Sequence, residues 1–175
     1  MTFEIVKAEE KDYELFASII QEVYEAMEEK EWFAADNAEY TYEMLKYSNG
    51  VGYKAIHQLG RGGWNFTYDI SWGFRGNLGR DIGLSESELL LVAHMDSVAI
   101  LPEYRGAGLQ KRLMQHAEQE LAEQGYRYFM CTVHPENRYS RQNIIKQGFK
   151  PVKTALKYGG YRREIFLRDR SEGLD

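Results

Sequence analysis

The residues best suited to chemistry lie between Ser97 and Arg112, in the order SVAILPEYRGAGLQKR. An apolar run typical of a strand ends at Pro102, and a loop of small residues then leads into a helix that begins near Leu109. Glycines in such a loop leave backbone N–H groups exposed, and the first turn of the helix adds the positive end of its dipole. The segment therefore predicts a binding site for a phosphate group.

Three cations surround this helix start. Arg105, Lys111 and Arg112 each oppose the helix dipole by about 0.3–1 kcal/mol, and a bound polyanion would reverse that effect. Two common phosphate motifs fit poorly, because the dinucleotide fingerprint needs a glycine where Lys111 stands and the P-loop needs a Gly-Lys-Ser/Thr sequence. NAD and ATP are therefore disfavoured. The plain alternative is a surface turn whose glycines serve only the backbone and whose cations are solvated.

The stretch from Val98 to Leu109 resembles the acetyl-CoA motif of the GNAT superfamily of N-acetyltransferases, in which Arg/Gln-x-x-Gly-x-Gly/Ala follows a strand that ends before a proline. Downstream, Asn137, Ser140 and the pair Gly148-Phe149 stand at spacings similar to a second motif of that superfamily. The two motifs and the order of elements extend the resemblance over nearly the whole chain, although the N-terminal half matches in outline only.

The resemblance implies an N-acetyltransferase that moves an acetyl group from acetyl-CoA to a primary amine of a small molecule or peptide by direct attack. It also implies that the backbone of Val98, Ala99 and Ile100 pairs with the pantetheine arm between splayed strands. Asn137 would bond the pantetheine amide, or serve simply as a helix N-cap. The other residues implied in acetyl-CoA binding are Arg105, Gly106, Ala107, Gly108, Leu109, Gln110, Lys111 and Ser140.

The chain departs from the superfamily pattern at the positions that supply acid and base. Thr132 stands where some members carry a glutamate base, and Ile144 stands where many carry a tyrosine acid. Gln110 replaces the last small residue of the loop. These departures keep a second function open, a catalytically silent acyl-CoA-binding module of the same fold. A structural α/β domain without a nucleotide ligand is a third reading.

Other side chains are candidates for the proton transfers that acetylation of an amine requires. Asp96 and His94 share one face of the strand leading into the loop, where an unpaired charge is costly, so one of them is expected to have a role. His134 follows the next strand and is a candidate base, and Tyr139 is a candidate acid, with Ser140 second. For each of these residues the plain alternative is a structural hydrogen bond or a surface position.

Cysteine and histidine usage favours neither covalent nor metal chemistry. Cys131, the single cysteine, lies between apolar neighbours and is expected to be a buried, inert thiol, and it cannot form an internal disulfide. The four histidines show no spacing typical of metal ligands, so no metal site is predicted.

Hydrophobic periodicity predicts the elements that must position these residues. Their order is strand, two helices, three strands, helix, strand, helix and two strands, which indicates one α/β (α+β) domain over residues 1–175. By resemblance, the central sheet would be mixed and mostly antiparallel, with six or seven strands and helices on both faces. Ser85 to Glu88 predicts a capping box, and Gly60 to Gly63 and Gly159-Gly160 predict hairpin turns.

Charge and hydropathy exclude several classes of partner. The 22 basic and 27 acidic residues give a net charge of −5, which argues against binding nucleic acid or anionic lipid. No apolar stretch is long enough to cross a bilayer, and the first residues do not form a signal peptide, so a cytoplasmic protein is expected. The aromatic strand from Trp64 to Phe74 can pair with a second copy of the chain, as a homodimer, if it lies at a sheet edge.

Overall fold

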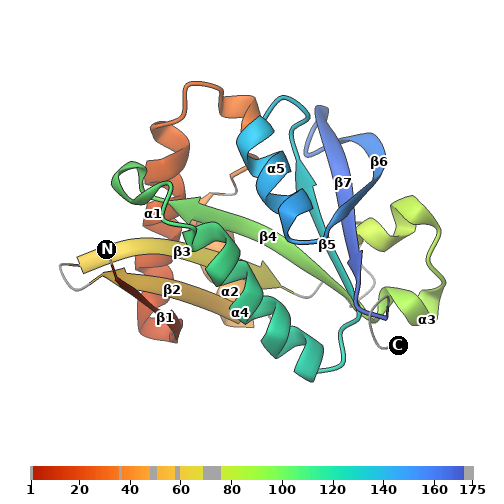
Figure 1. Cartoon of the computed structure of the whole chain (residues 1–175), viewed down its shortest axis with the longest axis horizontal. Coiled ribbons are helices and arrows are strands. Elements are labelled where there is room, and N and C mark those ends of the chain that lie inside the picture. The colour runs from red at the N-terminus through yellow and green to blue at the C-terminus, as the bar shows by residue number, and fades with distance from the viewer. Residues whose placement is uncertain (1, 36, 48–50, 58–59, 69–75, 172–175) are drawn as a thin grey trace.

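A sheet of seven strands forms the centre of the molecule (Figure 1). The computed structural model describes residues 2–35, 37–47, 51–57, 60–68 and 76–171, with only the backbone given for 60–68. The strands lie in the order β1-β2-β3-β4-β5-β7-β6, and only β4 and β5 pair in parallel. Their bounds are β1 Phe3–Lys7, β2 Val51–His57, β3 Gly60–Tyr68, β4 Val92–Ile100, β5 Tyr128–Val133, β6 Lys150–Lys157 and β7 Tyr161–Asp169.

Helices cover both faces of the sheet, with α4 and α5 in front of it and α1 and α2 behind it in Figure 1. Met114 of α4 and Ile144 of α5 pack with Phe129 of β5 in one core cluster. Phe16 of α1 packs with Ala99 of β4 in another cluster. The expected mixed sheet layered with helices is confirmed. The helices are α1 Tyr13–Glu25, α2 Ala38–Tyr47, the short α3 Glu86–Leu89, α4 Leu109–Glu123 and α5 Arg138–Lys146.

Three helices begin at a polar cap, and the sequence predicts two of these caps, at Ser85 and Asn137. The Oδ1 atom of Asn37 accepts a hydrogen bond from the N–H of Tyr40 in α2. Ser85 and Glu88 form the reciprocal capping box of α3. Asn137 caps α5 by accepting from the N–H of Ser140. Each cap satisfies a backbone donor that lacks a partner within its helix.

The first predicted hairpin turn is wrong in position. Gly60 to Gly63 belong to β3, whose pairing with β2 begins at Gly60 opposite His57. The register shifts between Ala55 and Ile56, which leaves Gly62 unpaired in a β-bulge. A glycine-rich sequence is compatible with a bulged strand as well as with a turn, because glycine easily adopts the unusual backbone angles that either can contain.

The aromatic strand is also shorter and more central than the sequence analysis expects. β3 ends at Tyr68, and the rest of the predicted strand, residues 69–74, lies outside the described residues. Because β2 and β4 flank β3 on its two sides, the condition for dimerisation through this strand is not met. In the following predicted loop, residues 78–82 form a 3₁₀ helix, η3 Leu78–Ile82. None of the helices in the described part of the chain has the length and apolar character needed to cross a bilayer.

Candidate functional site

The parallel strands β4 and β5 separate halfway along their length. They pair at only three positions, the last of which joins His94 to Met130. β4 then continues to Ile100 against β3, while β5 continues to Val133 against β7. In the described part of the chain, the edge of β4 that faces β5 therefore has no strand partner from Met95 onward. We call this gap the splay, and it matches the splayed sheet that the sequence analysis expects.

A β-bulge in β4 lies where the splay begins. Ser97 pairs with residue 66 of β3 and His94 with residue 68, so Met95 and Asp96 oppose a single residue of the partner strand. A bulge of this kind bends its strand, increases the local twist and redirects a side chain. Asp96 is only half-buried, whereas its neighbours Met95 and Ser97 are buried. Its carboxylate accepts a hydrogen bond from the Ser97 hydroxyl at 3.0 Å.

The loop after β4 has the open geometry that phosphate binding requires. Gly106 and Gly108 have φ values of +81° and +70°, a region that favours glycine, and a Cβ built on either would meet nothing within 4 Å. Gly108 is the N-cap of α4, and no side chain caps this helix, in contrast to α2, α3 and α5. The first N–H groups of a 15-residue helix thus lie beside an exposed loop.

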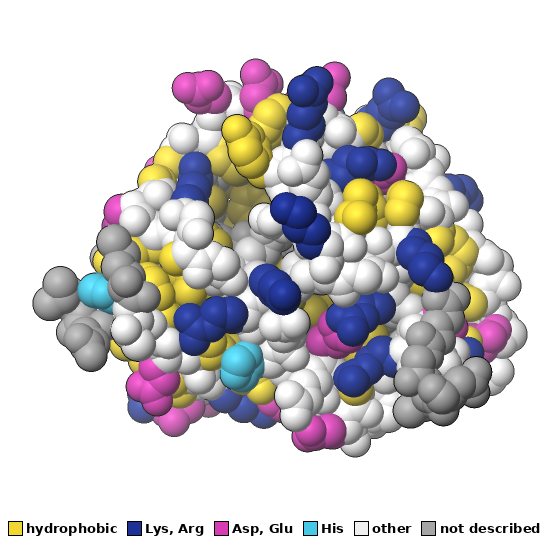
Figure 2. Space-filling view, viewed as in Figure 1, with side chains coloured by type: hydrophobic (Ala, Val, Ile, Leu, Met, Phe, Trp, Pro, Cys, Tyr) yellow, Lys and Arg dark blue, Asp and Glu magenta, His cyan; other side chains and the backbone are white. Residues whose placement is uncertain are grey.

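Cations gather over the same face. Figure 2 shows Lys and Arg side chains over the middle of the face that carries α4 and α5, with Asp and Glu mainly toward its rim. Arg105, Lys111, Arg138 and Lys146 are exposed, as expected for groups that meet a mobile anion. Arg112 differs from the expectation, because its Nη2 donates to the carbonyl of Phe3 at 2.8 Å and so ties α4 to β1.

The other residues implied in acetyl-CoA binding surround the loop and the splay. Val98 and Ile100 are half-buried beside α4, while Ala99 is buried on the opposite face and Leu109 is buried under the helix start. The side chain of Gln110 accepts from Asn143 of α5 at 2.9 Å, so it points toward α5. Asn137 acts as the helix cap, which leaves its amide N–H₂ as a donor.

Tyr158 is a residue that the sequence analysis missed. Its hydroxyl lies 3.0 Å from the hydroxyl oxygen of Thr132, on the part of β5 that lies beyond the last pair with β4. Although the residue is half exposed, burial of its hydroxyl end raises its pKa to about 12, and the nearby Asp96 adds to this rise. Its φ of 52° is unusual for a residue with a side chain, which marks a position held by its surroundings.

Strand alternation places Thr132 and His94 on one face of the sheet. Thr132 lies opposite Ile165 of β7, which packs on the face that carries η3, away from α5. His94 lies on that face as well, because its ring contacts Leu78 of η3. Asp96 lies within the bulge, where regular alternation is interrupted, and its charge acts on the Tyr158 hydroxyl. The structure therefore places the hydroxyls of Thr132 and Tyr158 together at the splay, within the electrostatic reach of Asp96.

The remaining catalytic candidates have less suitable surroundings. Tyr139 is 82% exposed, so the structure offers its phenol no enclosed site. His134 is half-buried, and its Nδ1 accepts from the N–H of Glu136 at 3.3 Å. This hydrogen bond occupies Nδ1 and leaves Nε2 as the ring nitrogen that a substrate could meet. Ile144 is buried in the core, as an apolar replacement should be.

His94 has the structural role that the sequence analysis left open. Its Nε2 accepts a hydrogen bond from the N–H of Leu78 at 3.1 Å, and the residue is buried. Burial, followed by the nearby Lys157, lowers its pKa to about 4. The ring is therefore neutral at physiological pH and joins η3 to β4.

This burial predicts a stability change in mild acid. The unfolded chain protonates His94 near its ordinary pKa of 6.5, whereas the folded chain does so only near 4. The free energy of unfolding should therefore fall by roughly 3 kcal/mol as the pH drops from about 6.5 to about 4. Urea unfolding across this range should show a smaller fall in His94→Gln, which keeps an acceptor but does not titrate. If His94→Gln and the exposed control His116→Gln follow the same curve, this origin of the fall is contradicted.

The structure supports neither covalent catalysis by Cys131 nor a metal site among the described residues. Burial raises the pKa of the Cys131 thiol to about 12, so it is no ready nucleophile. Within the described ranges, no group of three or more His, Cys, Asp or Glu side chains is arranged to hold a metal ion.

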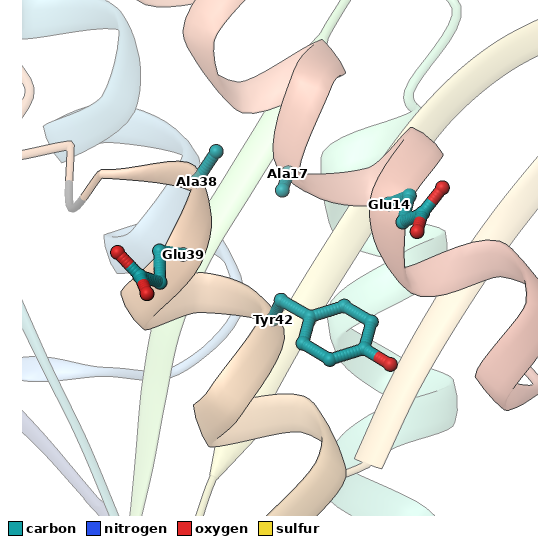
Figure 3. A pocket seen from close by; sticks show the side chains of 5 residues that line it. All are labelled: Glu14, Ala17, Ala38, Glu39 and Tyr42. Atoms are coloured by element: carbon teal, nitrogen blue, oxygen red, sulfur yellow. The ribbon is translucent and has the colours of Figure 1, made fainter.

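A separate pocket lies between α1 and α2 on the back of the sheet (Figure 3). It has a volume of about 290 Å³, with apolar walls and two carboxylates. Its lining shares no residue with the cluster around Asp96. The lining residues are Glu14, Ala17, Ala38, Glu39 and Tyr42.

Comparisons with known proteins agree with this geometry. Residues 9–149 match the family model described as the acetyltransferase (GNAT) family. A comparison with curated proteins found no match.

Similar solved structures include Arabidopsis thaliana NAA60 in complex with acetyl-CoA, at a TM-score of 0.73 and 13% identity over 97% of this chain and 99% of that one. An N-acetyltransferase from Staphylococcus aureus aligns at a TM-score of 0.71 and 15% identity, over 97% and 99%. The ribosomal-protein-S18-alanine N-acetyltransferase from Escherichia coli aligns at 0.70 and 16%, over 96% and 94%. Identities this low show a shared fold.

Proposed function

The chain belongs to the acetyltransferase (GNAT) family, and we propose that it transfers an acetyl group from acetyl-CoA to a primary amine. The observation that carries this proposal is the splay between β4 and β5, which opens directly above an uncapped helix start with two glycines at positive φ. One feature offers unpaired strand backbone, and the other offers unpaired N–H groups. Acetyl-CoA contains both an amide-bearing arm and a diphosphate, so it fits both.

The residues that hold acetyl-CoA in this proposal are those that the resemblance to the GNAT superfamily implies, and the chemistry of their groups suits this role. The backbone of Val98, Ala99 and Ile100 pairs with the pantetheine arm, and Asn137 offers it an amide donor. The N–H groups from Gly106 to Lys111 hold the diphosphate, with charge support from the exposed cations. When bound, acetyl-CoA supplies an acetyl group activated as a thioester.

Asp96 is the base in this proposal. An amine is mostly protonated at neutral pH and must lose a proton before it can attack a carbonyl carbon. The Asp96 carboxylate belongs to the bulge at the start of the splay and acts electrostatically on the Tyr158 hydroxyl, so an acceptor bound beside Tyr158 can give its proton to this carboxylate. His134 remains the second candidate base.

Tyr158 takes the role of acid that the sequence analysis gave to Tyr139. A phenol whose pKa is raised to about 12 keeps its proton at physiological pH, so it can donate that proton to a sulfur anion. The hydrogen bond to Thr132 holds the hydroxyl at the splay. Tyr139 lacks such an anchor, because most of its side chain is exposed to solvent.

Replacing Tyr158 by phenylalanine tests this role. The variant keeps the ring and loses only the hydroxyl, so we expect turnover to fall at least about tenfold with little change in acetyl-CoA affinity. Tyr161→Phe is the matched control, because that ring also lies beside Arg163. Stopped-flow detection of released CoA gives both rates. Equal turnover in the two variants would contradict an acid role for Tyr158.

The competing function is a silent acyl-CoA-binding module, which the replacement of the usual glutamate and tyrosine by Thr132 and Ile144 favours. A panel of amino acids, polyamines, aminoglycosides and peptide N-termini separates the two. Release of CoA with any acceptor, and a mass gain of one acetyl group on it, supports the enzyme. Tight acetyl-CoA binding without turnover on the whole panel supports the module. If the protein shows neither acetyl-CoA binding nor turnover, both functions are overturned.

A further inference from the structure

Arg163 of β7 is a buried cation with an unused donor. The residue is 2% exposed, and its Nη1 donates to the carbonyl of the adjacent Arg162 at 3.0 Å. Its Nη2 atom is buried and has no hydrogen-bond partner among the residues that the structure describes. A buried guanidinium N–H₂ without an acceptor is costly, and native structures rarely leave one without a reason.

The charge of Arg163 forms no close ion pair among the described residues, and Glu31 acts on it only from a greater distance. In the described part of the chain no carboxylate lies within 4 Å of it, whereas the neighbouring Glu164 pairs with Arg141 of α5 at 2.6 Å. Instead, the guanidinium lies beside the rings of Tyr158 and Tyr161, at 5.7 and 5.5 Å from their centroids. Such contacts stabilise a cation in part, but an aromatic face accepts no strong hydrogen bond. An anion would satisfy both the charge and the free N–H₂.

Arg163 lies next to the proposed acceptor site. Side chains alternate along β7, so Arg163 shares a face with Ile165, which lies opposite Thr132. Tyr158 links the two ends of this cluster, because its ring is beside Arg163 and its hydroxyl is beside Thr132. Asp96 and Arg163 both act electrostatically on that hydroxyl. One phenol is thus flanked by a carboxylate and by a guanidinium.

We propose that Arg163 binds a carboxylate of the acceptor, and that the substrates are amines that also bear a carboxylate, as free amino acids do. The ammonium of such a zwitterion faces Asp96 and its carboxylate faces Nη2 of Arg163, in a bond between planar groups that arginine is suited to form. This inference rests on the proposed acetyl transfer. It names the substrate class, which net charge alone does not reveal.

One of the two rings beside Arg163, that of Tyr161, is partly open to solvent. Tyr161 is 43% exposed and follows Gly159 and Gly160, whose φ values of +82° and +116° suit a turn of glycines. Displacement of the Tyr161 ring by the acceptor exchanges a cation–π contact for a charged hydrogen bond, which is the stronger of the two.

The experiment compares matched acceptors that differ only in the carboxylate. Each amino acid of a small set is assayed beside its amide and its decarboxylated amine, and kcat/KM is measured from CoA release. We expect wild type to prefer the amino acids by at least about tenfold, in line with the strength of a hydrogen bond between charged groups. In Arg163→Gln the preference should disappear, so that within this variant kcat/KM for each amino acid falls to the value for its amide. Arg162→Gln, an exposed neighbour, is the control and should keep the preference.

The outcomes separate this inference from the proposed function. Equal use of amino acids, amides and amines by wild type overturns the inference and leaves acetyl transfer standing. An equal loss on all acceptors in Arg163→Gln assigns Arg163 a purely structural role and also overturns it. No turnover on any amine despite acetyl-CoA binding overturns the proposed function itself. If Arg163→Gln does not fold, Arg163→Lys is assayed in its place. Calorimetry on wild type with bound CoA then compares N-acetyl amino acids with their amides. We expect the amides to bind more weakly, and equal binding would overturn the inference.

Discussion

Replacing Gly108 by valine is expected to weaken acetyl-CoA binding by at least about thirtyfold, the loss that one or two charged hydrogen bonds would cause. Gly108 adopts a φ of +70° at the N-cap of α4, and a β-branched residue strongly disfavours that conformation. Relieving the strain would turn the loop and move the N–H groups away from the diphosphate. The added methyl groups also occupy the space where the ligand must approach. Isothermal titration with acetyl-CoA measures the loss.

Gly83→Val is the matched control for this substitution. Gly83 has a φ of +79° at the end of η3, and, as at Gly108, a Cβ there would meet nothing within 4 Å. Both variants should lose about 1–2 kcal/mol of stability from the same backbone strain, but only Gly108→Val should lose affinity. If both variants lose stability and neither loses affinity, the loop is an ordinary surface turn.

Asp96→Asn is expected to reduce turnover by a factor of at least about ten, and by up to about 10⁴ if Asp96 alone removes the proton. The amide keeps an oxygen that can accept from the Ser97 hydroxyl, so the bulge should survive the change. Acetyl-CoA affinity should stay within about twofold, because the diphosphate loop is not altered. Single-turnover rates with the best amine of the panel, measured beside calorimetry, distinguish the two effects.

His134→Ala and Glu136→Gln complete this test. A larger loss of turnover in His134→Ala than in Asp96→Asn would assign the base to His134. Glu136→Gln is the control, because it removes an exposed carboxylate close to His134 and keeps the backbone N–H that donates to the His134 ring. Unchanged turnover in both Asp96→Asn and His134→Ala would contradict both assignments and leave water or the acceptor itself as the base.

Features encoded by neighbouring residues could be predicted from the sequence. Glycines that follow Pro102 predict an open loop because the requirement for positive φ is local, and the structure places Gly106 and Gly108 in that conformation. Ser85 and Asn137 cap their helices for the same reason, since each contacts an N–H group only three residues away. The mixed sheet followed from the order of such local elements.

Features that depend on register between distant strands could not be predicted. Tyr158 reaches Thr132 because the β6–β7 hairpin pairs with β5, and no local pattern reports that pairing. The different roles of His94 and Asp96 arise from contacts with η3 and from the bulge, which a regular alternation of residues conceals. Gly60 to Gly63 form part of a strand because β2 supplies partners from Gly60 onward and β4 begins to pair at Gly63.

Calorimetric titration of the wild-type protein with acetyl-CoA tests the central claim most directly. The account predicts binding of one equivalent that weakens as salt is added, because cations and helix N–H groups hold the diphosphate. The absence of any heat at millimolar acetyl-CoA, together with an unchanged melting temperature, would contradict it.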